Sequence, residues 1–251
     1  NSYGYLAGQG LFESEPYALV DTGWKATSQY GLSLILGKLK SRTHSGVTAF
    51  YLGLNKGHHL FDGDSALSFL FDWNRSGIDY RLYNFLCLEL LLSARDGRTI
   101  GYSDASDGYA PILLDNPCPE NLWAVDIHHE CVLSYVGYAS RFISLNDLSD
   151  GGARLCRKLV ATFISRPTSE EATVYGDLMI AGEMGERDLQ PLGPQMNYRE
   201  FALIALRKRK IRGFWPQGSL VRSGMRLAHL LYCLVLDIKL LDWYRRVILK
   251  Y

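Results

Sequence analysis

The stretch Tyr17–Gln29, YALVDTGWKATSQ, decides how the fold begins. The apolar run at 17–21 predicts a buried strand that ends at Asp21. Apolar residues spaced three and four apart at 27–40 predict a helix that closes on two lysines. The β-branched and aromatic run at 47–54 predicts a second strand. Strand, helix and strand at this spacing have the length of a βαβ unit with parallel strands.

The pattern changes at Asn116. Before it, 63–77 reads as a short apolar segment of helical type, 79–94 as a long buried helix, and 98–104 and 108–115 as two short strands. After it, helical spacing prevails at 119–143, 149–167, 168–182, 197–211 and 218–250. We therefore predict an α/β protein. Residues 1–116 form a Rossmann-like ligand-binding half, and residues 117–251 form an α-helical half that packs with it as one unit.

Composition limits the class of protein. Hydrophobic residues make up 47% of the chain and charged residues 21%, as in ordinary globular proteins. No apolar run reaches the ~18 residues of a membrane span. The five cysteines share no C-x-x-C spacing, which favours reduced thiols in a cytoplasmic protein, with Cys87, Cys131 and Cys233 in the core. Because the first residue is Asn1, we expect a module of a larger polypeptide.

Charge is distributed unevenly along the chain. Residues 207–251 hold 11 Lys and Arg against 2 Asp and Glu, a balance of +9, and residues 1–206 balance to −8. The run Arg207–Arg212, followed by Phe214 and Trp215, favours an anionic partner such as a membrane surface or a glycan-lipid phosphate. Nucleic acid is disfavoured because the rest of the chain is acidic. The alternative is a basic face that docks on the protein's own acidic surface.

The last helical pattern carries its own prediction. Its leucines and isoleucine form one apolar stripe, made of Leu227, Leu230, Leu231, Leu234, Ile238 and Leu241. We expect this stripe to pack on the core, and the basic run before it to contact an anionic membrane surface weakly.

The loop after the first strand has the residue types of an anion site. Gly23 permits a close turn, and Lys25, Thr27 and Ser28 offer donors beside the start of a helix, where free backbone amides also point. Asp21 could hold a metal ion or a sugar hydroxyl, or it could simply cap the helix. The spacing is not that of a Walker loop.

Several segments together resemble a known family: YLAGQGL (5–11), ALVDTGWKATSQYGLSLIL (18–36), VTAFYLGL (47–54), LELLLSARDGRTIGY (88–102), YAPILLD (109–115) and GFWPQGSL (213–220). The chain is similar to large bacterial proteins of cell-surface polysaccharide synthesis, which are predicted hydrolases of the haloacid dehalogenase superfamily associated with glycosyltransferases. The VD-x-GW-x-x-T-x-Q element is the most specific part. The D-x-D-x-T nucleophile motif of that superfamily is absent from this chain, so phosphatase activity is not implied.

The resemblance implies a role in capsule or O-antigen assembly, in the cytoplasm or peripherally at the inner membrane. The ligand expected is a phosphorylated sugar or nucleotide-sugar, and the reaction class glycosyl or phosphoryl transfer. We assign catalytic roles to Asp21 and Lys25. The expected ligand-binding residues are Thr22, Gly23, Trp24, Thr27, Ser28, Gln29, Tyr51, Glu89 and Trp215. The alternative is a non-catalytic scaffold whose helical half docks a glycosyltransferase. No cofactor is assigned.

Three weaker patterns remain as alternatives. GHHLFDGD places His58, His59, Asp62 and Asp64 close together, with residue types that bind metals. His128, His129 and Glu130 share a helical pattern, but adjacent residues point about 100° apart. YSDASDGY (102–109), with Glu130 and Asp147, resembles the carboxylates of an RNase H-like fold, although the helical pattern at 120–143 lacks the strands that fold requires.

Overall fold

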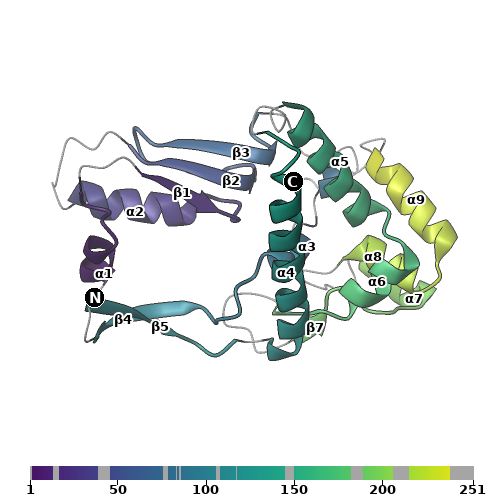
Figure 1. Cartoon of the computed structure of the whole chain (residues 1–251). Helices are drawn as coiled ribbons and strands as arrows, with labels where there is room; N and C mark the ends of the chain where they lie inside the picture. Colours follow the sequence, from purple (N-terminus) through teal and green to yellow (C-terminus); the bar gives the residue numbers. More distant parts are fainter. Residues whose placement is uncertain are drawn as a thin grey trace. The chain divides into compact units, whose positions relative to one another are not determined.

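The protein is an α/β protein with two compact units. The computed structural model describes residues 2–13, 17–38, 46–75, 79–82, 84, 86–105, 108–116, 118–144, 150–181, 189–205 and 215–237 (Figure 1). The first unit comprises residues 1–78 and 94–116, and the second comprises residues 79–93 and 117–251. The division thus falls at Asn116, but the segment 79–93, which the sequence placed in the first half, belongs with the helical unit.

A three-stranded parallel sheet forms the centre of the first unit. Strands β1 (Ala18–Asp21), β2 (Thr48–Leu54) and β3 (Ser65–Asp72) lie in that order, and helix α2 (Thr27–Lys38) connects the first two (Figure 1). The two predicted strands and the helix between them are confirmed. The helical prediction for 63–77 is wrong, because that segment forms β3. A short apolar run is compatible with either state, and pairing with β2 selects the strand.

The two faces of this sheet differ in burial. Leu19, Ala49 and Ala66 lie in one register row and belong to the core of the unit. The adjacent row, Val20, Phe50 and Leu67, is exposed, and Val20 retains 87% of its accessible surface. The α2 side therefore carries the core of the unit, while the described residues leave an apolar row open on the other side.

Gln29, on the first turn of α2, holds the helix to the sheet. Its amide nitrogen donates to the carbonyl oxygens of Val47 (2.8 Å) and Ser65 (3.1 Å), and its amide oxygen accepts from the Tyr51 hydroxyl at 3.1 Å. Gln29 is fully buried. Val47 and Ser65 stand at the amino ends of β2 and β3, so α2 begins alongside the sheet rather than beyond its carboxyl edge.

A β-hairpin completes the described part of the first unit. The two short strands predicted here are confirmed as β4 (Thr99–Ala105) and β5 (Gly108–Leu113), and they pair antiparallel. Helix α1 (Ser2–Gly8) packs on the hairpin, with the Tyr5 ring stacked on Tyr102 at 4.2 Å between centroids.

The second unit is mainly helical, as predicted. Its helices are η1 (a 3-10 helix, Tyr80–Leu82), α3 (Leu86–Leu91), η2 (a 3-10 helix, Pro119–Asn121), α4 (Leu122–Ala139), α5 (Asp150–Ser165), α6 (Ser169–Gly176), α7 (Tyr198–Ala205), α8 (Pro216–Arg222) and α9 (Arg226–Asp237). The predicted helix 79–94 is described as two short pieces. A short antiparallel pair, β6 (Met179–Ala181) and β7 (Leu189–Pro191), was not predicted.

Two helix boundaries have clear local causes. Helix α6 begins with a capping box at Thr168: the Thr168 hydroxyl accepts from the Glu171 amide at 3.1 Å, and the Glu171 carboxylate accepts from the Thr168 amide at 2.7 Å. The predicted helix 218–250 is interrupted between α8 and α9, where Gly224 adopts a φ of +69° that favours glycine.

Trp215 lies at the centre of the helical unit. Its side chain is fully buried with Cys87, Ile180 and Leu192. Its indole nitrogen donates to the carbonyl oxygen of Ile164 at 2.7 Å, and its backbone amide donates to that of Leu192 at 2.7 Å. One residue thus joins the end of α5, the segment after β7 and the start of α8.

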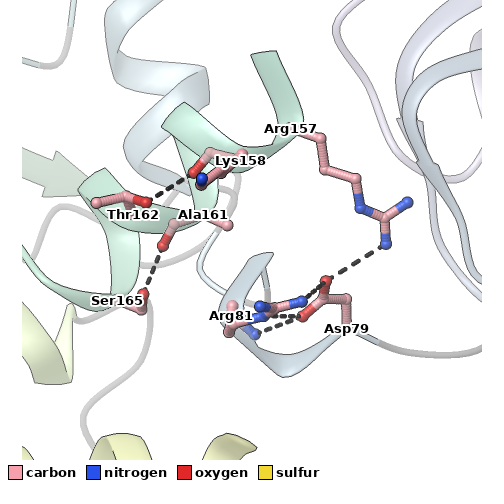
Figure 2. A network of polar contacts seen from close by, with 7 residues as sticks. All are labelled: Asp79, Arg81, Arg157, Lys158, Ala161, Thr162 and Ser165. Atoms are coloured by element: carbon pink, nitrogen blue, oxygen red, sulfur yellow. Dashed lines mark hydrogen bonds and ion pairs between the residues drawn. The ribbon is translucent and has the colours of Figure 1, made fainter. Parts of the chain in front are cut away.

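Asp79 connects η1 to α5 (Figure 2). Its carboxylate accepts from the side chain of Arg81 through two bonds of 3.1 Å and faces an Arg157 guanidinium nitrogen at 3.4 Å. Burial raises the pKa of the Asp79 carboxyl, but the hydrogen bonds and charge of Arg81, with the bond from Arg157, outweigh burial and hold the pKa below its ordinary value.

The end of α5 sets the orientation of α9. The carbonyl oxygen of Ser165 accepts from His229 Nε2 at 3.0 Å and from Cys233 Sγ at 3.1 Å. Terminal carbonyls of a helix lack partners within the helix, so donors four residues apart on α9 meet this need. The packed face of α9 therefore carries His229 and Cys233, in line with the buried Met225 just before the helix.

The predicted core packing of the leucine stripe is wrong for its described members. Leu227, Leu230, Leu231 and Leu234 are all exposed. Ile238 and Leu241 lie outside the described residues. The hydrogen-bond requirement of Ser165 accounts for the difference, because it turns the His229 and Cys233 face inward and the leucines outward.

We predict that Gln29→Leu destabilises the first unit by about 2–4 kcal/mol, because it removes the side-chain bonds to the Val47 and Ser65 carbonyl oxygens and takes away the buried acceptor of the Tyr51 hydroxyl. Tyr51→Phe removes one of the three bonds and should cost about 1 kcal/mol. Hydrogen exchange of the β2 and β3 amides measures the effect within this unit. Equal protection in Gln29→Leu and wild type would contradict the assignment.

We also predict a pH-dependent role for Asp79. Because its pKa is lower in the folded state, its ionised form contributes stability that is fully present above about pH 4 and is lost as the pH falls through the folded-state pKa. Asp79→Asn should cost about 1–3 kcal/mol at neutral pH, and the difference from wild type should shrink near about pH 3 in urea unfolding. Asp96→Asn, at an exposed carboxylate, is the control and should show neither effect.

Candidate functional site

The loop between β1 and α2 lies against the carboxyl end of β2. The Trp24 carbonyl oxygen accepts from the Asn55 amide at 2.7 Å, just past the last residue of β2. Asp21 Oδ1 accepts from the Gly23 amide at 2.6 Å. A Cβ on residue 23 would lie 2.9 Å from that carboxylate oxygen, so a side chain there would displace the Asp21 carboxylate. Asp21 thus shapes the loop, as the capping alternative anticipated in part, although its partner lies in the loop rather than in the helix.

The polar residues of this loop face solvent. Thr22, Lys25, Thr27 and Ser28 are exposed. Ala26 is buried and has a φ of +57°, the only positive value at a described residue other than glycine. A left-handed alanine is strained, and such strain concentrates at binding and catalytic loops. It places the methyl group of Ala26 in the core and leaves Lys25 outside.

Trp24 supports the loop from within. Its ring is buried and stacks on Phe71 at 5.7 Å, and Phe71 stacks in turn on Trp73 at 4.6 Å. Gly53 lies beneath this stack, since a Cβ there would meet the Phe71 ring at 2.5 Å. Trp24 therefore fixes the loop on the carboxyl end of the sheet rather than offering its ring to a ligand.

Asn55 and Asn74, which the sequence analysis did not select, lie at the same edge, together with His58 of the metal alternative. Asn55 Oδ1 is buried and has no hydrogen-bond partner within the described residues. His58 Nδ1 lies 3.1 Å from the Asn55 carbonyl oxygen and 3.1 Å from the Asn74 side-chain nitrogen. Asn74 Oδ1 accepts from the Gly57 amide at 3.1 Å. The polar residues that directly follow β2 and β3 were a usable signal, because carboxyl ends of parallel strands meet at one edge.

The proposed metal alternative at GHHLFDGD gains no support among the described residues. His58 belongs to the carboxyl edge, whereas Asp64 accepts from Ser33 Oγ at 2.7 Å and from the Val47 amide at 2.8 Å at the opposite end of the strands. No group of three His, Cys, Asp or Glu side chains arranged to hold a metal ion occurs in the described part of the chain.

Two predicted ligand-binding residues are committed to internal bonds. Gln29 uses both ends of its amide inside the protein, and the Tyr51 hydroxyl donates to it. Burial, followed by the charges of Asp21 and Asp64, raises the pKa of Tyr51 to about 12. Both side chains are buried beneath the candidate site, where they hold the structure and are not exposed to a ligand.

The remaining predicted site residues belong to the helical unit. Glu89 is half-buried on α3, and Trp215 is fully buried with its indole bonded to Ile164. The structure thus brings Asp21–Gln29 and Tyr51 together within one unit, with Asn55 added, and places Glu89 and Trp215 in the other. The basic run Arg207–Arg212 lies outside the described residues.

The histidine and carboxylate alternatives gain no support among the described residues either. The His128 ring stacks on Tyr175 at 5.5 Å, and burial, then the charge of His129, lowers the pKa of His128. Asp104 lies on the β4–β5 hairpin, Glu130 lies on α4, and Asp147 is outside the described residues. The helix predicted at 120–143 is confirmed as η2 and α4. An RNase H-like fold would require strands in this segment.

The cysteines are free thiols. Cys87, Cys118 and Cys233 are buried, and Cys131 and Cys156 are exposed. The core position predicted for Cys131 is therefore wrong, because the part of α4 that carries it faces solvent.

Comparisons with protein-family models, curated proteins and solved structures find no match to this chain. Among the described residues, none of the helices has the length and apolar character needed to cross a membrane.

We predict that the backbone of Ala26 is sensitive to side-chain shape. Ala26→Val should destabilise the protein by about 1–3 kcal/mol, because a β-branched residue tolerates positive φ poorly. Ala26→Gly removes the strain and should be close to neutral. Thermal unfolding of both variants measures the contrast, and a valine variant as stable as the glycine variant would contradict it.

Proposed function

We propose that the carboxyl edge of the β1–β2–β3 sheet binds a phosphorylated sugar or nucleotide-sugar. The observation that carries the proposal is the presence of two features at one edge of the sheet. Exposed Lys25 and Thr22 offer donors on the β1–α2 loop, and Asn55, whose amide bonds Trp24, has a buried side-chain oxygen without a partner among the described residues. A buried acceptor without a partner costs about 1–3 kcal/mol, which a hydroxyl or amino donor from a ligand would recover.

The two features suit the two parts of such a ligand. A phosphate would accept from the Lys25 ammonium and from the hydroxyls of Thr22 and Ser28. A sugar hydroxyl or a base amino group would donate to Asn55 Oδ1. Ligands bind at the carboxyl edges of parallel α/β sheets because the connecting loops leave room there.

Asp21 and Lys25 keep separate roles in this proposal. Lys25 would stabilise phosphate charge in a glycosyl or phosphoryl transfer. Asp21 uses Oδ1 to hold Gly23, and so acts first as a positioning residue for the loop. With the resemblance described above, this chemistry supports a module of bacterial surface-polysaccharide biosynthesis that acts in the cytoplasm, with a peripheral contact to anionic membrane through Arg207–Arg212.

A second candidate function is a scaffold for a glycosyltransferase or another protein. The exposed apolar surface of the helical unit favours it, since α4 and α9 present exposed side chains such as Leu133 and Leu227. Exposed apolar surfaces of this kind mark interaction sites.

The two functions are separated by ligand binding. Titration calorimetry with nucleotide-sugars, sugar phosphates and inorganic phosphate should detect at least one ligand. Lys25→Ala should weaken its binding by roughly tenfold, equal to about 1.4 kcal/mol, without lowering the melting temperature. Lys158→Ala, an exposed lysine of α5, is the matched control and should bind as wild type does.

Asn55→Leu tests the sugar or base contact. It should remove the preference for nucleotide-sugar over inorganic phosphate, because only the larger ligand reaches the side-chain oxygen. If no ligand of the panel binds, or if Lys25→Ala and Lys158→Ala bind equally, the loop is not the site and the scaffold function is favoured.

A further inference from the structure

The two ends of α4 have different surroundings. At its start, Asn121 donates from its side chain to the Met179 carbonyl oxygen at 2.6 Å and accepts from the Met179 amide at 2.9 Å. Ala124 and Val125 are buried, and His128 stacks on Tyr175. In contrast, every residue from 131 to 138 is exposed, and none of them is charged. The second half of this helix therefore presents an apolar surface to solvent on all sides.

One face of this exposed half is bounded by opposite charges. A helix advances about 100° per residue, so Glu130 and Arg141, eleven positions apart, lie within about 20° of each other. Arg141 lies in the turn that follows the end of α4 at Ala139. Helical bonding continues there, since the Arg141 amide donates to the Tyr138 carbonyl oxygen at 3.2 Å and the Ile143 amide donates to that of Ala139 at 2.9 Å. Neither Glu130 nor Arg141 forms an ion pair within the described residues.

Small residues lie between these charges. Ser134 and Gly137 share the face of Glu130 and Arg141, and a Cβ on Gly137 would meet nothing within 4 Å. Ala124 and Val125, which pack into the helical unit, lie on the opposite side of the helix. The face with small residues at its centre and charges at its ends therefore points away from the helix's own unit.

We propose that this face binds the same face of a second copy of the chain, with the two α4 helices antiparallel. A two-fold axis between residues 135 and 136 places Glu130 opposite Arg141 of the second copy, and Arg141 opposite its Glu130. The same axis places Ser134 opposite Gly137 and Leu133 opposite Tyr138. Small residues at the centre let the helices approach closely, and the larger side chains pack beside them.

The arrangement of charges favours a second copy of the chain as the partner. An isologous interface needs a surface that is complementary to itself, and one acid and one base at equal distances from an axis provide that. An anionic membrane would instead favour cations along both borders of the apolar face, where α4 has the acid Glu130 at one end. The proposal concerns the helical unit and does not depend on ligand binding by the β1–α2 loop.

Charge reversal in the full chain tests the pairing. Wild type should form a dimer in sedimentation equilibrium at micromolar concentration. Glu130→Arg and Arg141→Glu should each raise the dissociation constant by roughly tenfold or more, because each places like charges together twice per dimer. The double variant E130R/R141E should return to the wild-type value, because both pairs are restored with reversed sign.

Gly137→Leu tests the close approach. It should abolish the dimer while helix content is kept, because leucine is a better helix former than glycine. Gly151→Leu, on an exposed helical glycine of α5 that also has open space around it, is the matched control and should dimerise as wild type does.

The other outcomes overturn the proposal. A wild type that stays monomeric at all concentrations shows that this face is not a dimer interface. A double variant as weak as the single variants excludes the antiparallel register. A monomer that instead sediments with vesicles of anionic lipid, and loses this with Gly137→Leu, assigns the face to membrane. If Gly137→Leu does not fold, the surface charge variants decide the question alone.

Discussion

A buried polar side chain must find its partners inside the protein, and three such side chains determine the arrangement of the described elements. The Gln29 amide joins α2 to β2 and β3, the Asn121 amide pairs with Met179 in the manner of a strand, and the Trp215 indole joins α8 to α5. Each would cost free energy if left unpaired in an apolar interior. The geometry around each is therefore fixed more tightly than apolar contacts alone would fix it.

The position of the candidate site follows from the first of these side chains. Gln29 holds the first turn of α2 along the sheet, so the chain must travel back from the carboxyl edge between Trp24 and Thr27. The buried, left-handed Ala26 accommodates that return. The loop is thereby supported on its inner side, and its outer side is left to Lys25 and its hydroxyl neighbours. A rigid support of this kind lowers the entropy lost when a ligand binds.

Sequence periodicity predicted β1, β2, the two strands of the hairpin and most helices, because these depend on local apolar spacing. It did not separate polar residues that bind ligands from polar residues that hold the core. Gln29 and Ser33 are four residues apart on one helical face, and both are fully buried. That spacing was a signal for an inward polar face. β3 and the inward face of α9 depended on partners distant in sequence, β2 and Ser165, which no local pattern reveals.

Both units have a buried core and, in addition, expose apolar side chains on their surfaces. A parallel sheet is normally covered on both faces, yet the row Val20, Phe50 and Leu67 is exposed, as are the leucines of α9. Covering one such side chain fully is worth about 1.5–3 kcal/mol, which is a large fraction of a domain's net stability. Contacts that cover these surfaces would therefore add as much stability as the internal bonds described here. We therefore propose different partners for the polar loop and for the apolar faces: a small anionic ligand for the loop, and other protein surfaces for the faces.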